Sequence, residues 1–265
     1  MTIVFAVANQ KGGVGKTTTS VNLAASLGLM NREVLLIDLD PQGNATMGSG
    51  MEKKELPHSI YDVLIGEKSA EESLVKAEAA GYDVLGANSD LIGAEIELLD
   101  LDRREYRLKD ALIGFGSKYD FIVLDCPPAL GVLTLNGLVA SDSVIIPMQC
   151  EYYALEGLTA LLDTIDRISS SLNPKLKVEG LLRTMYDPRN SLSRDVSLHL
   201  IDHFGDAVYR TIVPKNVRLA EAPSYGVPVH FYDKYSRGSK AYLALAGEVL
   251  NRHPEAANKG GENGD

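Results

Sequence analysis

Cysteines and long apolar runs are scarce in this sequence of 265 residues. The two cysteines, Cys126 and Cys150, are too few for a disulfide scaffold, and neither lies in a pair with the spacing of metal ligands. No apolar run approaches the ~20 residues that a bilayer-spanning helix requires, and the N-terminus has neither the basic region nor the cleavage site of a signal peptide. These absences predict a cytosolic protein of a reducing compartment.

Basic residues are in the minority. Lys and Arg number 26 against 36 Asp and Glu, which gives a formal net charge of −10. A hydrophobic content of 45% with 23% charged residues is typical of globular proteins and excludes a disordered or fibrous chain. The length suits one large α/β domain and is short for two independent cores.

Short β-branched runs alternate with longer helical patterns along most of the chain. The strands are predicted as continuous apolar runs, typical of strands covered on both faces, at 3–8, 34–38, 82–86, 121–125, 144–147, 178–184 and 208–213. Helices are predicted at 15–29, 91–99, 104–114, 155–171, 191–204 and 239–252. This order predicts one α/β domain over 1–253, with a mostly parallel twisted sheet of about seven or eight strands and helices on both faces. The Gly-, Asn- and Glu-rich segment 254–265 predicts a disordered tail.

A glycine-rich turn follows the first predicted strand, with the sequence Asn-Gln-Lys-Gly-Gly-Val-Gly-Lys-Thr-Thr at residues 9–18. Backbone N–H groups of such a turn point at an anion, and the dipole of the following helix adds to the attraction. Lys16 is expected to reach the β- and γ-phosphates of a nucleotide, and the Thr17 hydroxyl to ligate Mg²⁺. Gln10 replaces the first glycine of the strict phosphate-loop pattern, and a second lysine, Lys11, follows it.

Two further predicted strands end in carboxylates, which meet at one edge of a parallel sheet. Asp125 is expected to hold Mg²⁺, as the aspartate after this strand does in phosphate-loop proteins. Asp38 is expected to support the metal shell, which makes the candidate metal set Thr17, Asp38 and Asp125. Asp40 is expected to orient or deprotonate the attacking water. The alternative is that Asp38 and Asp40 are two solvated turn carboxylates.

The chain resembles the ParA/MinD group of ATPases, whose phosphate loop is known as a deviant Walker A motif. The match rests on residues 11–18, 38–43 and 124–128. Three later segments, 147–157, 184–187 and 213–223, narrow the resemblance to the ParA/Soj branch, which partitions chromosomes and plasmids. The resemblance covers roughly residues 1 to 252.

This resemblance implies a Mg²⁺-dependent ATPase whose ATP state is a sandwich dimer. Lys11 would cross the interface to the partner's phosphates and act with Lys16 and Asp40 in catalysis, while Gly12 would let the two backbones approach closely. Hydrolysis would release the dimer. The implied nucleotide-binding residues are Lys11, Gly12, Gly13, Val14, Gly15, Lys16, Thr17 and Thr18 for the phosphates and Met185, Pro214 and Asn216 for the adenine.

The same resemblance implies non-specific binding to nucleoid DNA, and hence a cytoplasmic, nucleoid-associated protein stimulated by a ParB-type partner. Residues 183–240 carry 9 Lys and Arg against 6 Asp and Glu, a local charge of +3 in an acidic chain. Arg189, Lys215 and Arg218 are the candidate DNA contacts, because a few phosphate contacts per subunit suffice for non-specific binding. The alternative is that they are ordinary surface cations.

Three other functions remain open. A MinD-like membrane ATPase would need a basic amphipathic C-terminal helix, but only Arg252 and His253 follow the apolar segment 242–250, so no membrane partner is expected. An iron–sulfur protein would need Cys126 and Cys150 as shared cluster ligands, although both fit buried apolar positions better. A ParA-like ATPase that positions another cargo has no distinguishing sequence feature.

Overall fold

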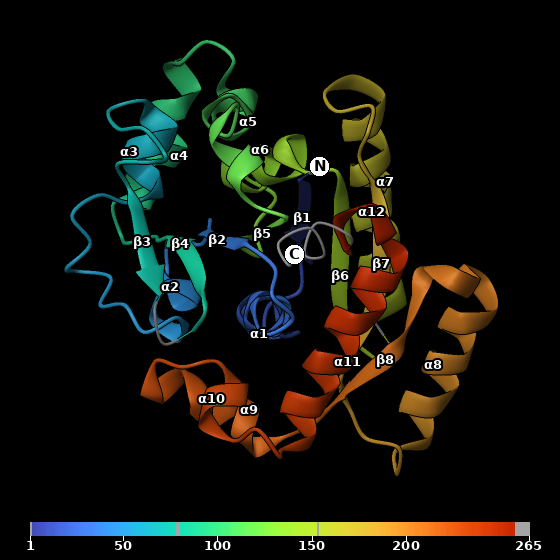
Figure 1. The fold of residues 1–265 in the computed structure, drawn as a ribbon. Coiled ribbons are helices and arrows are strands. Elements are labelled where there is room, and N and C mark those ends of the chain that lie inside the picture. Colours follow the sequence, from blue (N-terminus) through green and yellow to red (C-terminus); the bar gives the residue numbers. More distant parts are fainter. Residues whose placement is uncertain (1, 78–79, 153, 258–265) are drawn as a thin grey trace.

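The computed structural model describes residues 2–77, 80–152 and 154–257. In this part of the chain the strands form one eight-stranded sheet of order β3-β4-β2-β5-β1-β6-β7-β8, shown in Figure 1. The strand bounds are β1 Ile3–Val7, β2 Val34–Asp38, β3 Leu74–Ala77, β4 Tyr82–Leu85, β5 Phe121–Asp125, β6 Ser143–Gln149, β7 Lys177–Tyr186 and β8 Val208–Pro214. All neighbouring strands are parallel except the hairpin of β3 and β4. The predicted fold class is therefore confirmed.

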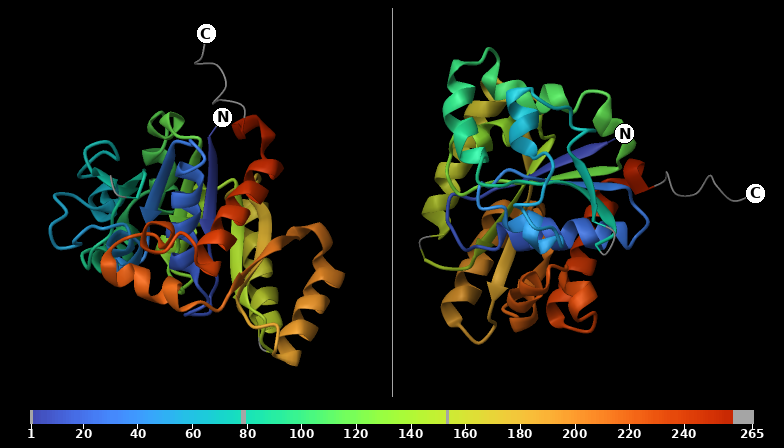
Figure 2. Two further views of the ribbon diagram at one scale, coloured as in Figure 1. Left: turned by 60° about the horizontal axis from the view of Figure 1, so that its bottom comes forward. Right: turned by 90° about the vertical axis from the view of Figure 1, so that its left-hand side faces the viewer.

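Helices cover both faces of the sheet (Figure 2). The α-helix bounds are α1 Lys16–Gly28, α2 Asn44–Gly48, α3 Ile60–Ile65, α4 Leu91–Glu97, α5 Arg107–Ala111, α6 Val132–Ala140, α7 Ala154–Ser171, α8 Ser191–Phe204, α9 Val217–Glu221, α10 Val229–Tyr232, α11 Arg237–Arg252 and α12 Pro254–Ala257. The 3₁₀ turns are η1 Leu98–Asp100, η2 Arg104–Tyr106, η3 Phe115–Lys118, η4 Gly205–Ala207 and η5 Ala222–Tyr225. Helices α3 to α8 pack on one face, and α1, α10 and α11 pack on the other. None of the described helices is long and apolar enough to cross a membrane.

The central strands explain where the site lies. All five residues of β2 and of β5 are buried, because helices cover both sides of these strands. Their register pairs Asp38 with Asp125, and Asp125 also pairs with Val7 at the end of β1. The three strands therefore deliver two carboxylates and the start of the glycine-rich loop to the same edge of the sheet.

Two sequence predictions need correction. The segment 104–114 was predicted as one helix, but it divides into η2 and α5, and the chain leaves the helix at Leu112. The segment 254–265 was predicted as a disordered tail, yet α12 forms a helical turn in which Ala256 is fully buried. The turn is anchored because the preceding His253 is itself buried and bonds to Glu179 on β7. Residues 258–265 of that predicted tail lie outside the described residues.

Candidate nucleotide site

The loop between β1 and α1 presents backbone donors at the N-terminus of α1. Gly13 and Gly15 have φ angles of 73° and 89°, which residues with a Cβ rarely adopt. Gly15 is the N-cap of α1; among the described residues no side chain caps this helix, and its first turn holds no acidic residue. The N–H groups and the helix dipole therefore favour an anion at residues 9–18.

Lys16 is the buried cation of this loop. Its residue surface is 7% exposed, and its Nζ donates to the carbonyl oxygen of Lys11 at 3.3 Å. Burial lowers the pKa of Lys16, whereas the charges of Asp125 and Asp40 raise it. The ammonium group thus lies within electrostatic reach of both carboxylates, so three predicted site residues share one location.

Asp125 is bound to two hydroxyl groups of helix α1. Its Oδ2 accepts a hydrogen bond from Thr17 Oγ1 at 2.7 Å, and its Oδ1 accepts one from Ser20 Oγ at 2.8 Å. Burial, followed by the charge of neighbouring Asp38, raises the pKa of Asp125 to about 8. The predicted metal ligands Thr17 and Asp125 are therefore in direct contact. The contact of Ser20 was not predicted, although its position one turn after Lys16 was a usable signal.

Asp38 is fully buried and holds the loop that follows β2. Its Oδ2 accepts from the backbone N–H and the hydroxyl of Thr46, both at 2.8 Å, and its Oδ1 accepts from the N–H of Asp40 at 3.1 Å. Burial raises the pKa of Asp38 to about 6. One oxygen of Asp38 binds each end of the segment 40–46, so this side chain positions the loop that carries Asp40. The sequence predicted only a supporting role in the metal shell and did not find Thr46.

Asp40 lies half-buried at the start of this loop. Its Oδ1 accepts from the N–H of Gln42 at 2.9 Å, and its carbonyl accepts from the N–H of Gly43 at 2.8 Å. Gly43 has a φ of 62°, and a Cβ there would lie 2.7 Å from the carbonyl oxygen of Ala87. The turn therefore requires glycine, and it keeps the Asp40 carboxylate near Lys16.

The second lysine of the loop is on the surface. Lys11 Nζ forms an ion pair of 2.6 Å with Glu151, and the two side chains are 43% and 56% exposed. The backbone N–H of Lys11 donates to Asn9 Oδ1 at 3.0 Å, and Asn9 Nδ2 donates to the carbonyl of Pro147 at 2.8 Å. Lys11 and Lys16 thus occupy different environments, one exposed and one buried. The sequence did not predict the contact with Glu151.

A cavity of about 280 Å³ adjoins the glycine-rich loop. Gly15 and Thr18 line it together with Met185, Pro214 and Asn216. The three residues that the resemblance implied for adenine binding therefore lie together beside the phosphate loop, although Met185 is separated from the other two by helix α8.

Side-chain contacts fix the walls of this cavity. Thr184 Oγ1 donates to the carbonyl of Val14 at 2.7 Å, which ties β7 to the phosphate loop. Met185 has a φ of 48°, and its Sδ accepts from Gln149 Nε2 at 2.7 Å. Asn216 Oδ1 is buried and has no hydrogen-bond partner among the described residues. A buried acceptor without a partner fits a ligand that donates a hydrogen bond.

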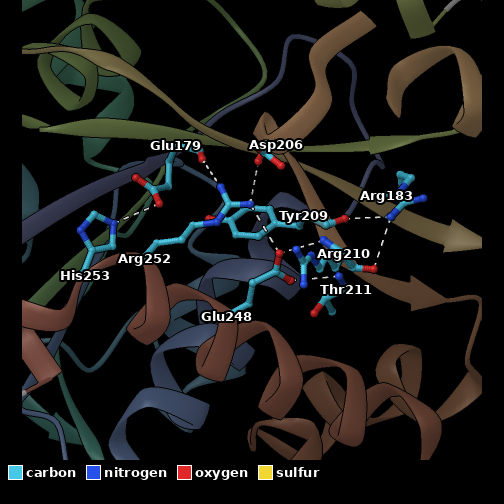
Figure 3. A network of polar contacts seen from close by, with 9 residues as sticks. All are labelled: Glu179, Arg183, Asp206, Tyr209, Arg210, Thr211, Glu248, Arg252 and His253. Carbon is cyan, nitrogen blue, oxygen red and sulfur yellow. Dashed lines mark hydrogen bonds and ion pairs between the residues drawn. The ribbon is translucent and has the colours of Figure 1, made fainter. Parts of the chain in front are cut away.

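A polar network holds strand β8, which ends at Pro214 two residues before Asn216 (Figure 3). The pairing of β7 with β8 is irregular next to Arg183, which leaves backbone groups of β8 without partners in the sheet. Arg183 Nη2 donates to the carbonyls of Tyr209 and Arg210 at 2.8 and 3.3 Å. Glu248 accepts from the N–H groups of Arg210 and Thr211 at 2.8 and 3.0 Å. The first half of β8 is therefore positioned by side chains as well as by sheet bonds.

The candidate DNA contacts lie at the ends of β7 and β8. Tyr186 pairs with Pro214, and the N–H of Lys215 donates to the carbonyl of Tyr186 at 3.2 Å. The loop that carries Arg189 and the segment that leads to Arg218 on α9 therefore begin at adjacent strand ends, and all three predicted cations are exposed.

Both arginines have acidic partners within the chain, which the sequence analysis did not predict. Arg189 forms an ion pair of 2.8 Å with Asp187, and hydrogen bonds from Arg189 lower the pKa of this aspartate to about 2. Arg218 forms ion pairs with Glu221 at 2.7 Å and with Asp233 at 3.4 Å. Such exposed pairs are worth little, so a phosphate can compete for either arginine.

The two cysteines are buried in the hydrophobic core. Burial raises the pKa of both thiols, to about 11 for Cys150. Cluster ligation needs thiolates, so this environment disfavours the iron–sulfur alternative. No group of three or more His, Cys, Asp and Glu in the described residues can hold a metal ion. A Mg²⁺ ion at Thr17 and Asp125 would therefore need phosphate oxygens as further ligands.

Comparison with known proteins gave close matches over most of the chain. A family model described as "AAA domain" matches residues 2–178. The chain is 52% identical over 251 residues to the chromosome partitioning protein ParA of Caulobacter vibrioides, covering 94% of each protein. It is 51% identical over 246 residues to the sporulation initiation inhibitor protein Soj of Bacillus subtilis, covering 93% of this chain and 97% of Soj. A crystal structure described as cobyrinic acid a,c-diamide synthase of Mycobacterium smegmatis, with bound ADP and magnesium, is 42% identical with a TM-score of 0.84 and covers 98% of each chain.

Proposed function

Because the chain belongs to the ParA/Soj family of phosphate-loop ATPases and uses ATP with Mg²⁺, we propose that it partitions DNA as a nucleotide-switched dimer. ATP binding drives two copies into a sandwich, the sandwich binds DNA without sequence preference, and hydrolysis releases it. The observation that carries this proposal is that the two lysines of one loop lie in different environments. Lys16 is buried at the site, whereas Lys11 is exposed beside it and is free to exchange Glu151 for a stronger anion.

The phosphate loop and the adjoining cavity fit a nucleoside triphosphate. The phosphates would lie on the N–H groups at the start of α1, with Lys16 supplying charge. The adenine would lie in the cavity beside Met185 and Pro214, where its amino group can donate to the partnerless Asn216 Oδ1. Thr17 and Asp125 would hold Mg²⁺, which neutralises charge on the phosphate oxygens when bound.

Asp40 is the proposed residue for water activation. Its carboxylate would orient the attacking water and accept its proton. The water oxygen then bonds to the γ-phosphorus as the bond to the β–γ bridging oxygen breaks, which yields ADP and phosphate. The catalytic gain comes from positioning, since Asp38 holds the backbone N–H of Asp40 and fixes the carboxylate near the phosphates.

The proposed dimer gives a role to Gly12 and Lys11 that contacts within a single chain do not supply. A Cβ at Gly12 would meet no described atom within 4 Å, and Gly12 has no positive φ, so nothing within the chain requires glycine there. The close approach of a second backbone would require it. Lys11 would then neutralise the charge of the partner's triphosphate across the two-fold interface.

Exposed cations at the ends of β7 and β8 support DNA binding by the dimer. Arg189, Lys215 and Arg218 would contact phosphates, and the dimer would double their number. The proposed location is the cytoplasm on the nucleoid, without a membrane partner, and a ParB-type protein bound to DNA would stimulate hydrolysis. A second candidate is a ParA-like ATPase that positions another cargo by the same cycle.

Sedimentation with ATP and DNA tests this proposal on the wild type, Lys16→Ala and Asp40→Ala. We expect the wild type to form an ATP-dependent dimer on DNA and Lys16→Ala to stay monomeric. Asp40→Ala should remain as a DNA-bound dimer because it binds ATP without turnover. A wild type that stays monomeric with a non-hydrolysable ATP analogue contradicts the dimer, and normal hydrolysis by Asp40→Ala contradicts the catalytic assignment. Binding confined to one DNA sequence contradicts non-specific partition.

A further inference from the structure

Helix α4 and the turn η1 expose an apolar stripe to solvent. Ile92, Ile96 and Leu99 are 55%, 70% and 55% exposed. Their spacing of four and three residues puts them on one face of consecutive helical turns. The opposite face packs normally on the core, through the buried residues Leu91, Ala94 and Leu98. The stripe is therefore an unpartnered face of an otherwise anchored helix.

The stripe lies in a strongly acidic segment. Residues 90–102 contain no Lys or Arg, and their five carboxylates are Asp90, Glu95, Glu97, Asp100 and Asp102. Arg103 and Arg104 follow directly, but they form ion pairs with Asp110 and Glu105, and Arg104 Nη1 donates to the carbonyl of Leu99 at 3.2 Å. Acids around an apolar stripe favour a partner segment with apolar side chains flanked by Lys or Arg. A second copy of this chain offers no such match through the same face, because two acidic faces repel each other.

The segment before α4 contacts the loop that carries Asp40. The N–H of Ala87 donates to Thr46 Oγ1 at 2.9 Å, and the same hydroxyl donates to Asp38 Oδ2 at 2.8 Å. Asp38 in turn accepts from the N–H of Asp40. The carbonyl of Ala87 also lies against Gly43. A displacement of α4 would therefore reach the Asp40 loop through two direct contacts.

We propose that α4 and η1 form the docking surface for a basic amphipathic segment of the protein that stimulates hydrolysis, and that docking adjusts Asp40 through Ala87, Thr46 and Asp38. The inference rests on the proposed function, since it concerns the stimulating partner of the same site. Thr46 is a positioning residue here, because it acts through Asp38 and touches no reacting atom. The partner would raise kcat, because the Asp40 loop acts on water activation and not on ATP affinity.

A designed variant of the stripe tests the docking surface. Ile96→Glu places a charge at the centre of the stripe, and Leu198→Glu on α8, where the leucine is 58% exposed, is the matched control. The probes are a purified ParB-type protein with DNA and a synthetic helical peptide of repeated Lys-Leu-Leu-Lys. We expect Ile96→Glu to keep basal hydrolysis and the ATP-dependent dimer. It should bind the peptide at least tenfold more weakly and lose stimulation, while Leu198→Glu behaves as the wild type.

Other outcomes separate this inference from the proposed function. Equal peptide affinity and equal stimulation of wild type and Ile96→Glu overturn the docking surface and leave the partition function intact. Loss of the dimer in Ile96→Glu alone makes the stripe an interface between copies, which also overturns it. A wild type that binds the peptide through the stripe but is not stimulated by the ParB-type protein instead contradicts the partner assigned under the proposed function.

The relay through Thr46 has its own test. Thr46→Val removes the hydroxyl, and Thr46→Ser keeps it as the conservative control. We expect Thr46→Val to bind the peptide as tightly as the wild type while its stimulated kcat falls at least fivefold with little change in KM, and Thr46→Ser to restore stimulation. Full stimulation of Thr46→Val contradicts the relay.

Discussion

Gly180 on β7 lies directly under the ring of Tyr209 on β8, and replacing it with alanine should destabilise the protein. A Cβ at this position would lie 2.5 Å from Tyr209 Cε2 and 2.9 to 3.0 Å from two further ring atoms. These contacts are shorter than any van der Waals separation, so either the ring or the strand must move.

The ring has little room to move. Tyr209 is fully buried, and the guanidinium of Arg252 lies over it at 4.1 Å from the ring centre (Figure 3). Overpacking of this kind costs about 1–3 kcal/mol. At roughly 2–4 °C per kcal/mol for a domain of about this size, the melting temperature should fall by about 2–12 °C.

Thermal unfolding of Gly180→Ala measures this effect, and Gly247→Ala is the matched control. Gly247 lies inside α11, where a Cβ would meet no described atom within 4 Å. Alanine there should stabilise the protein by roughly 0.5–1 kcal/mol, because it reduces the freedom of the unfolded chain. Gly180→Ala should also cost less in a Tyr209→Ala background, since the clash is gone. An unchanged melting temperature of Gly180→Ala, or an equal cost in both backgrounds, refutes the reasoning.

Three further predictions concern charge. Lys11→Ala should still bind ATP, but sedimentation should show roughly 10- to 100-fold weaker dimerisation, because a charge-assisted contact of about 1.5–3 kcal/mol is lost. Unchanged dimerisation contradicts the role of Lys11 across the interface. Glu179 and His253 form a buried pair of 3.0 Å in which hydrogen bonding and charge outweigh burial, so the pKa of Glu179 is lowered and that of His253 is raised. The pair should stabilise the fold most between about pH 4.5 and 6.5. This stabilisation is lost as the pH falls through the Glu179 pKa or rises through the His253 pKa. In urea unfolding, the free energy of unfolding of His253→Ala should therefore depend less on pH than that of the wild type. Arg189→Ala and Arg218→Ala should each weaken DNA binding equally for all sequences and reduce the slope of log affinity against log salt by about 1 per lost phosphate contact, and an unchanged slope contradicts that contact.

The phosphate loop and its carboxylates were predictable because they depend on local sequence. A buried strand, a run of glycines and a helix place Lys16 and Thr17 at a helix N-terminus wherever the strand is central. Asp125 and Asp38 follow from the same logic, since each ends a continuous apolar strand. Their separate roles were not predictable. Asp38 positions the loop because it accepts two hydrogen bonds from Thr46, and these form only once α2 lies beside the end of β2.

The internal partners of the surface cations were also beyond the sequence. Asp187 lies two residues from Arg189, and a pair at that spacing forms only in a particular turn. Glu151 reaches Lys11 from the connection after β6, at a sequence distance of 140 residues. Contacts of this kind depend on where the strand ends meet, which composition and periodicity do not contain.

The amino-acid sequence alone determined the class of this protein: an α/β domain with a glycine-rich anion site, because strand burial, glycine turns and helix dipoles act between neighbours along the chain. Tertiary structure decided which groups share a cavity and which carboxylate holds a loop. It brought Met185 on β7 and Asn216 before α9 to one cavity, and it linked Ala87 to Asp40 through Thr46 and Asp38. The physical reason is that such contacts exist only once the sheet order β3-β4-β2-β5-β1-β6-β7-β8 has brought distant segments together.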